Sequence, residues 1–381
     1  MLIKNGLVFN SEKGFGSVDI EISAAKISIV GQNLTASEQI DATDCYVIPG
    51  LIDTHFHGAK GCDFCDASEE SIEKIAKYEL QNGITGIIPA SMTLSFDELG
   101  KIFGAAASYA EHHDYSDNKA DFLGINMEGP FLSPDRIGAQ NPKHLLNPDI
   151  EMTDELIRKS NNLVKIIDIA PELDGADEFI EKFHDRVRLS LAHTMCTYEE
   201  AMHAFDKGVK QLTHTFNAMP WIQNRMPGPI IAATEKSNIA AEIICDGVHV
   251  HPAMVRTLFK LFGDDRMIMI SDSISATGMP DGKYQLGGLD VYVKDKKSVG
   301  ESGNIAGSVC NLMDCLRTAV KEMNIPLHSA IKAASTNPSK AYGFIDRGDI
   351  KPGYRADLLI LDKDLEIKTI IKSGKILGGK Q

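Results

Sequence analysis

The sequence predicts an α/β fold: a (β/α)8 TIM-like barrel with a small β-sandwich domain built from both chain termini. Through the middle of the chain, short apolar runs alternate with amphipathic stretches of helix length, a pattern typical of βα units around a parallel sheet. The two ends instead contain short strand-like runs separated by Gly and Asn. An open doubly wound sheet would usually carry a glycine-rich phosphate loop after an early strand, and the sequence has neither G-x-G-x-x-G nor a Walker A loop.

The β-rich ends predict the small domain. In the first fifty residues, the runs rich in β-branched residues are Leu2–Phe9, Val18–Ile22, Lys26–Val30 and Cys45–Ile48. Near the C-terminus, the turn Gly348–Gly353 precedes the strands Ala356–Leu361 and Ile367–Lys372. We therefore expect residues 1–49 and 345–381 to form one β-sandwich domain and residues 50–344 to form the barrel.

The middle of the chain contains eight strand candidates, which suits a barrel of ordinary size with insertions. They are Gly50–His57, Ile84–Ala90, Phe122–Glu128, Val164–Ala170, Val187–His193, Gln211–His214, Ala240–Asp246 and Met267–Asp272.

Composition narrows the class of function. The chain has 381 residues, of which 43% are apolar and 24% charged, as in ordinary globular proteins. Its formal charge of -14 excludes a general nucleic-acid-binding surface, which needs clustered Lys and Arg. A local basic pocket can still oppose the overall field and bind an anionic small molecule.

The sequence also predicts a cytoplasmic protein with no membrane segment. No window approaches the ~18 apolar residues that span a bilayer, and the start of the chain lacks a signal-peptide pattern. Most of the seven cysteines lie in apolar runs, as reduced, buried thiols do. Cys62 and Cys65 have C-x-x-C spacing, but no second pair exists, so a structural zinc site is not expected. A redox role for the pair stays open.

Polar residues at the strand ends carry the functional prediction. They are His55, His57, Glu128, His193, His214 and Asp272, at the ends of five predicted strands. The carboxyl ends of barrel strands converge on one face, where the active site lies. His55 and His57 are two residues apart, which places both imidazoles on one side of a strand. Imidazole and carboxylate groups together suit zinc, iron or manganese.

This ligand set predicts a metal-dependent hydrolase. A bound divalent metal lowers the pKa of water to about 7 in favourable cases and polarises a carbonyl oxygen. A leaving amine needs a proton, so a carboxylate must first accept one from water and then donate it. Asp272 at the end of the last strand is the candidate for this role; its alternative role is that of a helix N-cap.

Several motifs, in order, resemble a known family. Pro49–Gly58 resembles the opening signature of the amidohydrolase superfamily, and Lys351–Leu358 resembles its closing signature. Within that superfamily, the chain is similar to the N-acetylglucosamine-6-phosphate deacetylase family from about residue 4 onward. The matching segments are Met127–Phe131, Ala192–Thr194, Thr213–Met219, Cys245–Val250, Ser271–Ser273 and Ile305–Ser308.

The resemblance implies an enzyme of amino-sugar catabolism and cell-wall sugar recycling, which releases acetate from N-acetyl-D-glucosamine 6-phosphate. It implies that Glu128, His193 and His214 hold the principal metal and that Asp272 is the general base and then the acid. Arg225 and His249 would contact the sugar phosphate from the neighbouring subunit of a homodimer. The sugar site would be lined by Ala139, Gln140, Asn217, Ala218, Ile305, Ala306 and Gly307.

Two departures from the family pattern qualify these expectations. Some members lack the first-strand His pair and use one metal; here His55 and His57 are present, so one or two ions remain open, with Glu128 as the bridge if there are two. Some relatives carry His at the position of Gln140, and an amide cannot carry a proton.

The end of strand four has no Lys, which argues against the related ring-opening amidohydrolases that bridge their metals with a carboxylated Lys.

Two alternatives stay open. The first is the same chemistry on the galactosamine epimer of the substrate, because epimers differ at one hydroxyl and a few pocket residues decide. The second is a non-catalytic binding protein on the same fold, although such relatives typically lose metal ligands that are all present here.

Overall fold

The centre of the protein is a curled parallel sheet. A computed structural model describes residues 1–112, 118–301 and 303–377. Six parallel strands follow the order β13-β14-β15-β16-β17-β18, and three more follow the order β12-β11-β8. Their bounds are β8 (Leu51–Asp53), β11 (Ile84–Ile87), β12 (Asp121–Phe122), β13 (Ile125–Met127), β14 (Val164–Ile169), β15 (Arg188–Leu191), β16 (Gln211–Leu212), β17 (Ala240–Ile244) and β18 (Met267–Ile270).

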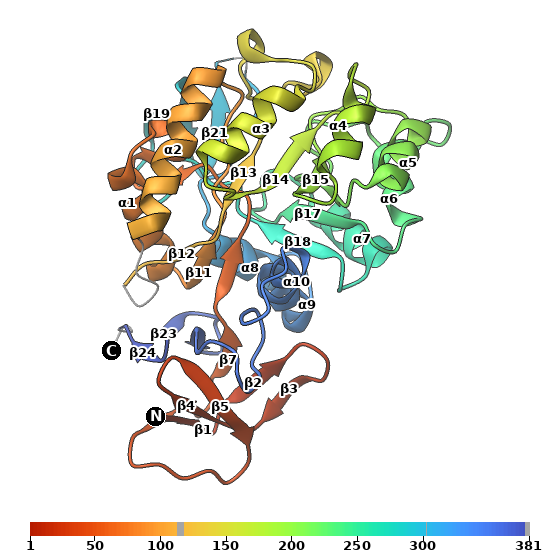
Figure 1. Cartoon of the computed structure of the whole chain (residues 1–381). Helices are drawn as coiled ribbons and strands as arrows, with labels where there is room; N and C mark the ends of the chain where they lie inside the picture. The colour runs from red at the N-terminus through yellow and green to blue at the C-terminus, as the bar shows by residue number, and fades with distance from the viewer. Residues whose placement is uncertain (113–117, 302, 378–381) are drawn as a thin grey trace.

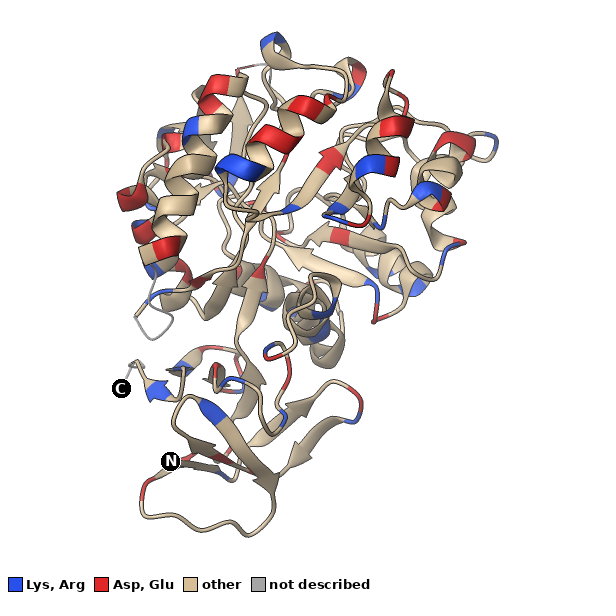
Figure 2. Ribbon diagram, viewed as in Figure 1, with Lys and Arg blue, Asp and Glu red and all other residues tan. Residues whose placement is uncertain are grey.

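Helices cover the outside of this sheet (Figure 1). The strands are largely apolar and almost wholly buried, as expected for parallel strands covered on both faces. Figure 2 shows Asp and Glu positions along the ribbons of the first three helices. The helices are α1 (Glu69–Gln81), α2 (Phe96–His112), α3 (Ile150–Lys159), α4 (Ala176–Phe183), α5 (Tyr198–Lys207), α6 (Gly228–Thr234), α7 (Pro252–Phe262), α8 (Leu312–Lys321), α9 (Leu327–Ile331) and α10 (Asn337–Ala341).

Backbone hydrogen bonds connect the two sets of parallel strands. After β18, the amide of Asp272 donates to the carbonyl of His55 at 2.9 Å, and the amide of His57 donates to the carbonyl of Ser273 at 2.7 Å. On the other side, the amide of Ser91 donates to the carbonyl of Asn126 at 2.9 Å. The segments that follow β8 and β18 therefore lie side by side. The segment that follows β11 likewise lies beside strand β13.

The predicted alternation of strands and helices is confirmed, with shorter strands. The expected strand Phe122–Glu128 is interrupted at Gly124, whose φ of +156° breaks the regular ladder, so β12 and β13 are separate. An antiparallel hairpin sheet was not predicted. It comprises β19 (Gly282–Leu286), β20 (Leu289–Lys294) and β21 (Lys297–Gly300), and its apolar positions are too few to indicate strands from the sequence.

Strands from both chain ends share a sheet. β22 pairs antiparallel with β7, with Leu358 opposite Pro49, and one sheet runs β24-β23-β22-β7-β2-β3 while the other runs β5-β4-β1-β6. Both sheets contribute side chains to one buried apolar cluster. These strands are β1 (Leu2–Lys4), β2 (Leu7–Asn10), β3 (Gly14–Ser17), β4 (Asp19–Ser23), β5 (Lys26–Gly31), β6 (Gln39–Asp41), β7 (Tyr46–Pro49), β22 (Leu358–Leu361), β23 (Ile367–Lys372) and β24 (Lys375–Ile376).

A buried ionic network joins the terminal sheet to the parallel strands. The carboxylate of Asp121 in β12 lies 2.6 Å from the ammonium of Lys372 in β23, and both side chains are fully buried. The guanidinium groups of Arg347 and Arg355 also contact Asp121, at 2.9 and 3.3 Å. Asp357 accepts a hydrogen bond from Arg355 at 3.0 Å. Pairing among these groups reduces the cost of removing their charges from water.

Among the described residues, no helix is both long enough and apolar enough to cross a bilayer.

Candidate active site

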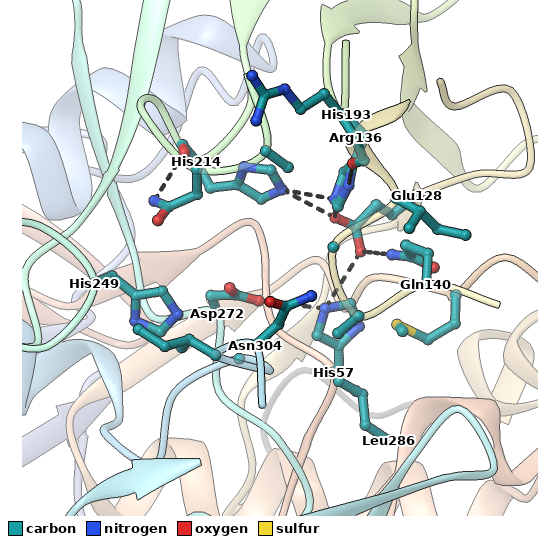
Figure 3. A pocket seen from close by; sticks show the side chains of 18 of the residues that line it. His57, Glu128, Arg136, Gln140, His193, His214, His249, Asp272, Leu286 and Asn304 are labelled. Carbon is teal, nitrogen blue, oxygen red and sulfur yellow. Dashed lines mark hydrogen bonds and ion pairs between the residues drawn. The ribbon is translucent and has the colours of Figure 1, made fainter. Parts of the chain in front are cut away.

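A cavity of about 370 Å³ opens where the parallel strands end. Most of the side chains predicted for the site line it, although they come from segments far apart in the sequence. The predicted residues in its lining are His57, Glu128, Ala139, Gln140, His193, His214, Asn217, Ala218, His249, Asp272, Ile305 and Gly307. The structure therefore gathers the strand-end residues into one pocket (Figure 3).

Glu128 lies at the centre of the polar cluster. Its Oε1 atom is 3.3 Å from Nε2 of His193 and 3.2 Å from Nε2 of His214, and those two ring nitrogens are 3.1 Å apart. All three side chains are buried. Figure 3 shows Glu128 between the His193–His214 pair on one side and His57 on the other.

A second group of possible ligands lies on the opposite side of Glu128. Nε2 of His57 is 3.4 Å from Oε2 of Glu128 and 3.3 Å from Oδ1 of Asp272. Nε2 of His55 lies beneath the pocket, 3.5 Å from Oε1 of Glu128 and 4.0 Å from Oδ1 of Asp272. Oε1 of Glu128 thus faces His193, His214 and His55, whereas Oε2 faces His57.

Three of the four imidazoles are oriented by hydrogen bonds on their outer nitrogens. Nδ1 of His193 lies 2.8 Å from the carbonyl oxygen of Arg136, and Nδ1 of His57 lies 3.2 Å from that of Ala90. Nδ1 of His55 lies 3.2 Å from Oε2 of Glu242. A proton held on Nδ1 leaves Nε2 with its lone pair directed into the cluster, the arrangement found in metal-ligating histidines.

The donor set fits a first-row divalent metal. Ligands about 2.0–2.1 Å from one ion lie roughly 3.0–3.4 Å from each other, which matches the separations among Glu128, His193 and His214. Nε2 of His55 is buried with no hydrogen-bond partner, which would be costly for a group with no role. Among the described residues, two groups have ligand atoms close enough to share an ion: Glu128, His193 and His214, and His55, His57 and Asp272.

The backbone at the strand ends adopts left-handed torsion angles. φ is +43° at His193, +29° at His214 and +50° at Asp272. Such values are uncommon for residues other than Gly, cost roughly 1–3 kcal/mol each and cluster at functional sites. The hydrogen bonds around these residues hold their side chains toward the pocket against this cost.

The electrostatics keep both central carboxyl groups ionised. Burial favours their neutral forms, but the imidazoles of His55, His193 and His214 hold the pKa of Glu128 well below its usual value. At Asp272, burial is likewise outweighed by the hydrogen bond from His57 and by the charges of His55, His57 and His249, so the pKa is lowered. Asp272 can therefore accept a proton at neutral pH.

Gln140 orients Glu128. The amide N–H of Thr93 donates to Oε1 of Gln140 at 2.7 Å, which directs the Nε2 group of Gln140 to Oε2 of Glu128 at 2.8 Å. Because the amide cannot rotate without losing the Thr93 contact, it fixes which carboxylate oxygen faces His57.

His249 lines the pocket of its own chain. It lies in the loop before α7, and its Nδ1 is 2.7 Å from Oδ2 of Asp246. Burial lowers and Asp246 raises the pKa of His249, with a net increase. This position differs from the implied contribution to a neighbouring subunit.

Three predicted residues do not line the pocket. His55 lies beneath it as described, and Ala306 is fully buried next to the pocket residues Ile305 and Gly307. Arg225 is exposed in the loop between β16 and α6. Neither metal-ligand group among the described residues contains a cysteine, and burial raises the pKa of Cys65 well above its usual value, which favours the neutral thiol.

The pocket also contains residues that sequence reasoning missed. They are Met92, Asp135, Arg136, Ile137, Gly138, Leu286 and Asn304. Arg136 carried a usable signal, because it lies shortly after the third predicted strand and four residues before Gln140. Leu286 comes from the unpredicted hairpin, and nothing in the sequence indicates that it reaches the site.

Comparison with known proteins gives a consistent result. A family model described as the amidohydrolase family matches residues 46–377. The N-acetylglucosamine-6-phosphate deacetylase of Lysinibacillus sphaericus is 30% identical, covering 99% of this chain and 97% of the relative. The N-acetylgalactosamine-6-phosphate deacetylase of Escherichia coli O157:H7 is 32% identical over 86% of each chain.

A solved structure agrees with these sequence comparisons. It is a variant of N-acetyl-D-glucosamine-6-phosphate deacetylase from Mycobacterium smegmatis in complex with N-acetyl-D-glucosamine-6-phosphate, 31% identical, with a TM-score of 0.93 over 99% of this chain and 98% of that one.

Proposed function

This chain belongs to the amidohydrolase family, and we propose that it hydrolyses N-acetyl-D-glucosamine 6-phosphate to D-glucosamine 6-phosphate and acetate. The observation that carries the proposal is the convergence of Glu128, His193 and His214 with the ionised carboxylate of Asp272 in one pocket. The Lysinibacillus relative and the Mycobacterium complex support the choice of sugar.

The proposal includes the complete architecture that the family implies. The two sets of parallel strands would be parts of one (β/α)8 barrel at residues 50–344, supported by the hydrogen bonds between His55 and Asp272 and between Ser91 and Asn126. The terminal sheets would form the β-sandwich domain of residues 1–49 and 345–381, supported by the shared apolar cluster.

A principal divalent ion, zinc, iron or manganese, would be held by Glu128, His193 and His214. A second ion would be held by His55 and His57, with Glu128 shared between the two sites, because Oε2 of Glu128 faces His57 while Oε1 faces His193 and His214. A divalent cation there supplies Lewis acidity, which lowers the pKa of water and polarises an amide carbonyl.

Asp272 moves the proton. Its carboxylate, kept ionised by the neighbouring imidazoles, accepts a proton from the attacking water. The resulting carboxylic acid then donates that proton to the nitrogen of the leaving amine, so the sugar departs as a neutral amine. If only one ion is bound, Nε2 of His57, 3.3 Å from Oδ1 of Asp272, is free to hold the carboxylate in place between these two transfers.

The sugar would occupy the remaining pocket. Asn217, Ala218, Ala139 and the Ile305–Gly307 segment would line it, and His249 would contact the substrate from its own chain. Arg136, which lines the same pocket, offers a guanidinium for the phosphate within this chain, because Arg binds phosphate through paired N–H groups.

A homodimer would add Arg225 of one subunit to the site of the other. Support comes from the exposed loop around this residue, in which Trp221 is 72% and Met226 63% exposed. Large apolar side chains that are exposed together are typical of association surfaces. Mutation of Arg225 to Ala should raise KM for the sugar phosphate more than it lowers kcat.

The proposal places the reaction in the cytoplasm, as part of amino-sugar catabolism and cell-wall sugar recycling. All seven cysteines are free thiols, which suits a reducing compartment. Cell fractionation with an antibody to the protein would test the location.

The galactosamine epimer is the second candidate substrate. The relative from Escherichia coli O157:H7, which is named for that epimer, is 32% identical, so identity alone does not favour one sugar. A comparison of kcat/KM for the two phosphates with purified protein would decide between them.

An acetate-release assay tests the proposal as a whole. Purified protein incubated with N-acetyl-D-glucosamine 6-phosphate should form acetate and primary amine in equal amounts. Absence of acetate from both epimers, with metal supplied, would instead favour a non-catalytic binding protein.

A further inference from the structure

A second cavity, of about 300 Å³, lies at the opposite edge of the parallel sheet from the active site. It is close to the first residues of β14, β15 and β16, whereas the metal-ligand candidates follow the last residues of their strands. Its lining comprises Lys165, His184, Asp185, Arg186, Val187, Arg188, Lys210, Ala341 and Tyr342.

The lining is rich in positive charge that the protein does not neutralise. Among the described residues, no carboxylate lies within ion-pair distance of Lys165, Arg188 or Lys210, whereas Arg186 pairs with Asp154 at 2.5 Å. The lining's carboxylate, Asp185, has an 84% exposed side chain and contacts His184. In a chain whose net charge is -14, three unpaired cations in one cavity create a local field that attracts anions.

Three hydrogen bonds fix the guanidinium of Arg188. Its Nε donates to Oε1 of Gln211 at 2.7 Å, and its two terminal nitrogens donate to the carbonyl oxygens of Ala341 and Lys210 at 3.1 and 3.0 Å. The guanidinium carbon lies 5.6 Å from the centre of the Tyr342 ring. A guanidinium has five N–H groups, so one N–H on each terminal nitrogen remains after these bonds.

A chain of buried hydrogen bonds runs from Arg188 to the metal-ligand candidates. Gln211, which accepts from Arg188, donates through Nε2 to Oε1 of Glu242 at 2.7 Å. The other oxygen of Glu242 lies 3.2 Å from Nδ1 of His55 and accepts the backbone amide of His214 at 3.2 Å. A movement of the Arg188 guanidinium would therefore shift Gln211 and Glu242, and with them the hydrogen bonds that Glu242 makes to His55 and to the backbone of His214.

We propose that this basic cavity binds a phosphate group and that its occupancy acts on the active site through Arg188, Gln211 and Glu242. The phosphate group is that of inorganic phosphate or of a small phosphate ester. Lys165 and Lys210 supply the charge, and the free N–H groups of Arg188 supply directed donors. Binding does not depend on the proposed function, whereas the effect on the active site rests on it.

The binding part is tested on metal-free protein by equilibrium dialysis against inorganic phosphate. The variant Lys165→Met/Lys210→Met removes the charge from the cavity. The control Lys13→Met/Lys260→Met makes the same charge change at exposed residues outside it. Wild type and control should bind one more phosphate per chain than the cavity variant, which allows for phosphate in the active site. Equal binding by all three folded proteins overturns the proposal.

Competition distinguishes the two sources of phosphate. If glycerol 3-phosphate displaces the extra phosphate at a lower concentration than inorganic phosphate does, the ligand is an ester. If it fails to displace it, the ligand is inorganic phosphate.

The effect on the active site is measured as the initial rate of N-acetyl-D-glucosamine 6-phosphate hydrolysis below KM, because that substrate is itself a phosphate ester and would fill the cavity at saturation. In the cavity variant, phosphate should act only by competing for the active site. In wild type and control, it should change the rate by about fivefold or more beyond that competition. An identical response in all three proteins overturns the coupling. Absence of any deacetylation would contradict the proposed function and leave the dialysis result unaffected.

Discussion

At the scale of single residues, the site depends on where protons are held. Each of His55, His57 and His193 has an oxygen acceptor next to Nδ1, so Nε2 is left for a metal. Asp272 and Glu128 both have lowered pKa values because imidazoles surround them. A carboxylate is therefore the proposed metal ligand at Glu128 and the proposed proton carrier at Asp272, according to the groups around it.

Mutation of Asp272 to Asn should lower kcat by roughly 100- to 10,000-fold, because an amide cannot accept the proton that a general base removes. The side chain keeps its shape, so the metal at Glu128, His193 and His214 should remain. Steady-state kinetics and metal analysis of the same preparation check both statements. Near-normal turnover would refute the assigned role.

Mutation of Gln140 to Leu should weaken metal binding by about 10- to 100-fold, since removal of a group that orients a ligand has effects of that size. Competition with a chromogenic chelator measures the affinity. The control is Gln81→Leu at the exposed end of α1. If the two variants bind metal equally well, Gln140 does not position Glu128.

At the scale of elements, the strand ends could be predicted and the loops could not. The spacing of His55 and His57, and the polar residues that follow buried strands, indicate the site because strand direction alone gathers them. The contact between Glu242 and His55 depends on how β17 and β8 lie across the sheet, which local patterns do not contain. Arg136 reaches the pocket from a short 3-10 helix, Asn304 from an irregular segment and Leu286 from the hairpin, and the positions of these segments follow from tertiary packing.

Helix α1 contains a buried carboxyl group with an expected effect on stability. Neither oxygen of Glu79 has a hydrogen-bond partner, and the side chain is fully buried. Burial, with the charges of Asp53 and Asp314, raises the pKa of Glu79 well above its usual value. The native state then keeps a proton that the unfolded state releases, so the free energy of unfolding falls as pH rises above about 4.5.

Mutation of Glu79 to Gln should remove this dependence. The variant should resemble wild type near pH 4.5 and exceed it in stability at pH 8, with a difference of up to about 1.4 kcal/mol per pH unit between the unfolded and folded pKa values. Part of the slope remains, because burial also raises the pKa of Asp53 to about 7. Urea unfolding at several pH values measures it, with the exposed Glu70→Gln on the same helix as control. Parallel curves for wild type and Glu79→Gln would contradict the account.

At the scale of the whole molecule, the two chain ends are held to the parallel strands by charge as well as by apolar contact. Lys372 and Asp121 are both fully buried, and residues from the C-terminal segment supply the other cations around Asp121. The network lies at the edge of the sheet where β12 begins, away from the pocket. Its expected role is therefore to stabilise the fold rather than to take part in the reaction.

Mutation of Lys372 to Met should destabilise the protein by about 3–5 kcal/mol, because it leaves a buried carboxylate with fewer partners. The control Lys363→Met breaks a pair with Asp44 in which the two side chains are 71% and 74% exposed; such a pair contributes at most about 1 kcal/mol. Guanidinium unfolding of both variants measures the difference. Equal losses would show that the buried network contributes no more than a surface pair.

The central claim is that the Glu128, His193 and His214 cluster makes this protein a metal-dependent deacetylase. The most direct measurement is acetate release from N-acetyl-D-glucosamine 6-phosphate by protein stripped with a chelator and then titrated with Zn²⁺, Fe²⁺ or Mn²⁺. The account predicts that activity is lost on stripping and returns in proportion to bound ion with at least one of the three metals. Full activity in metal-free protein, or no acetate after reconstitution with any of them, would contradict it.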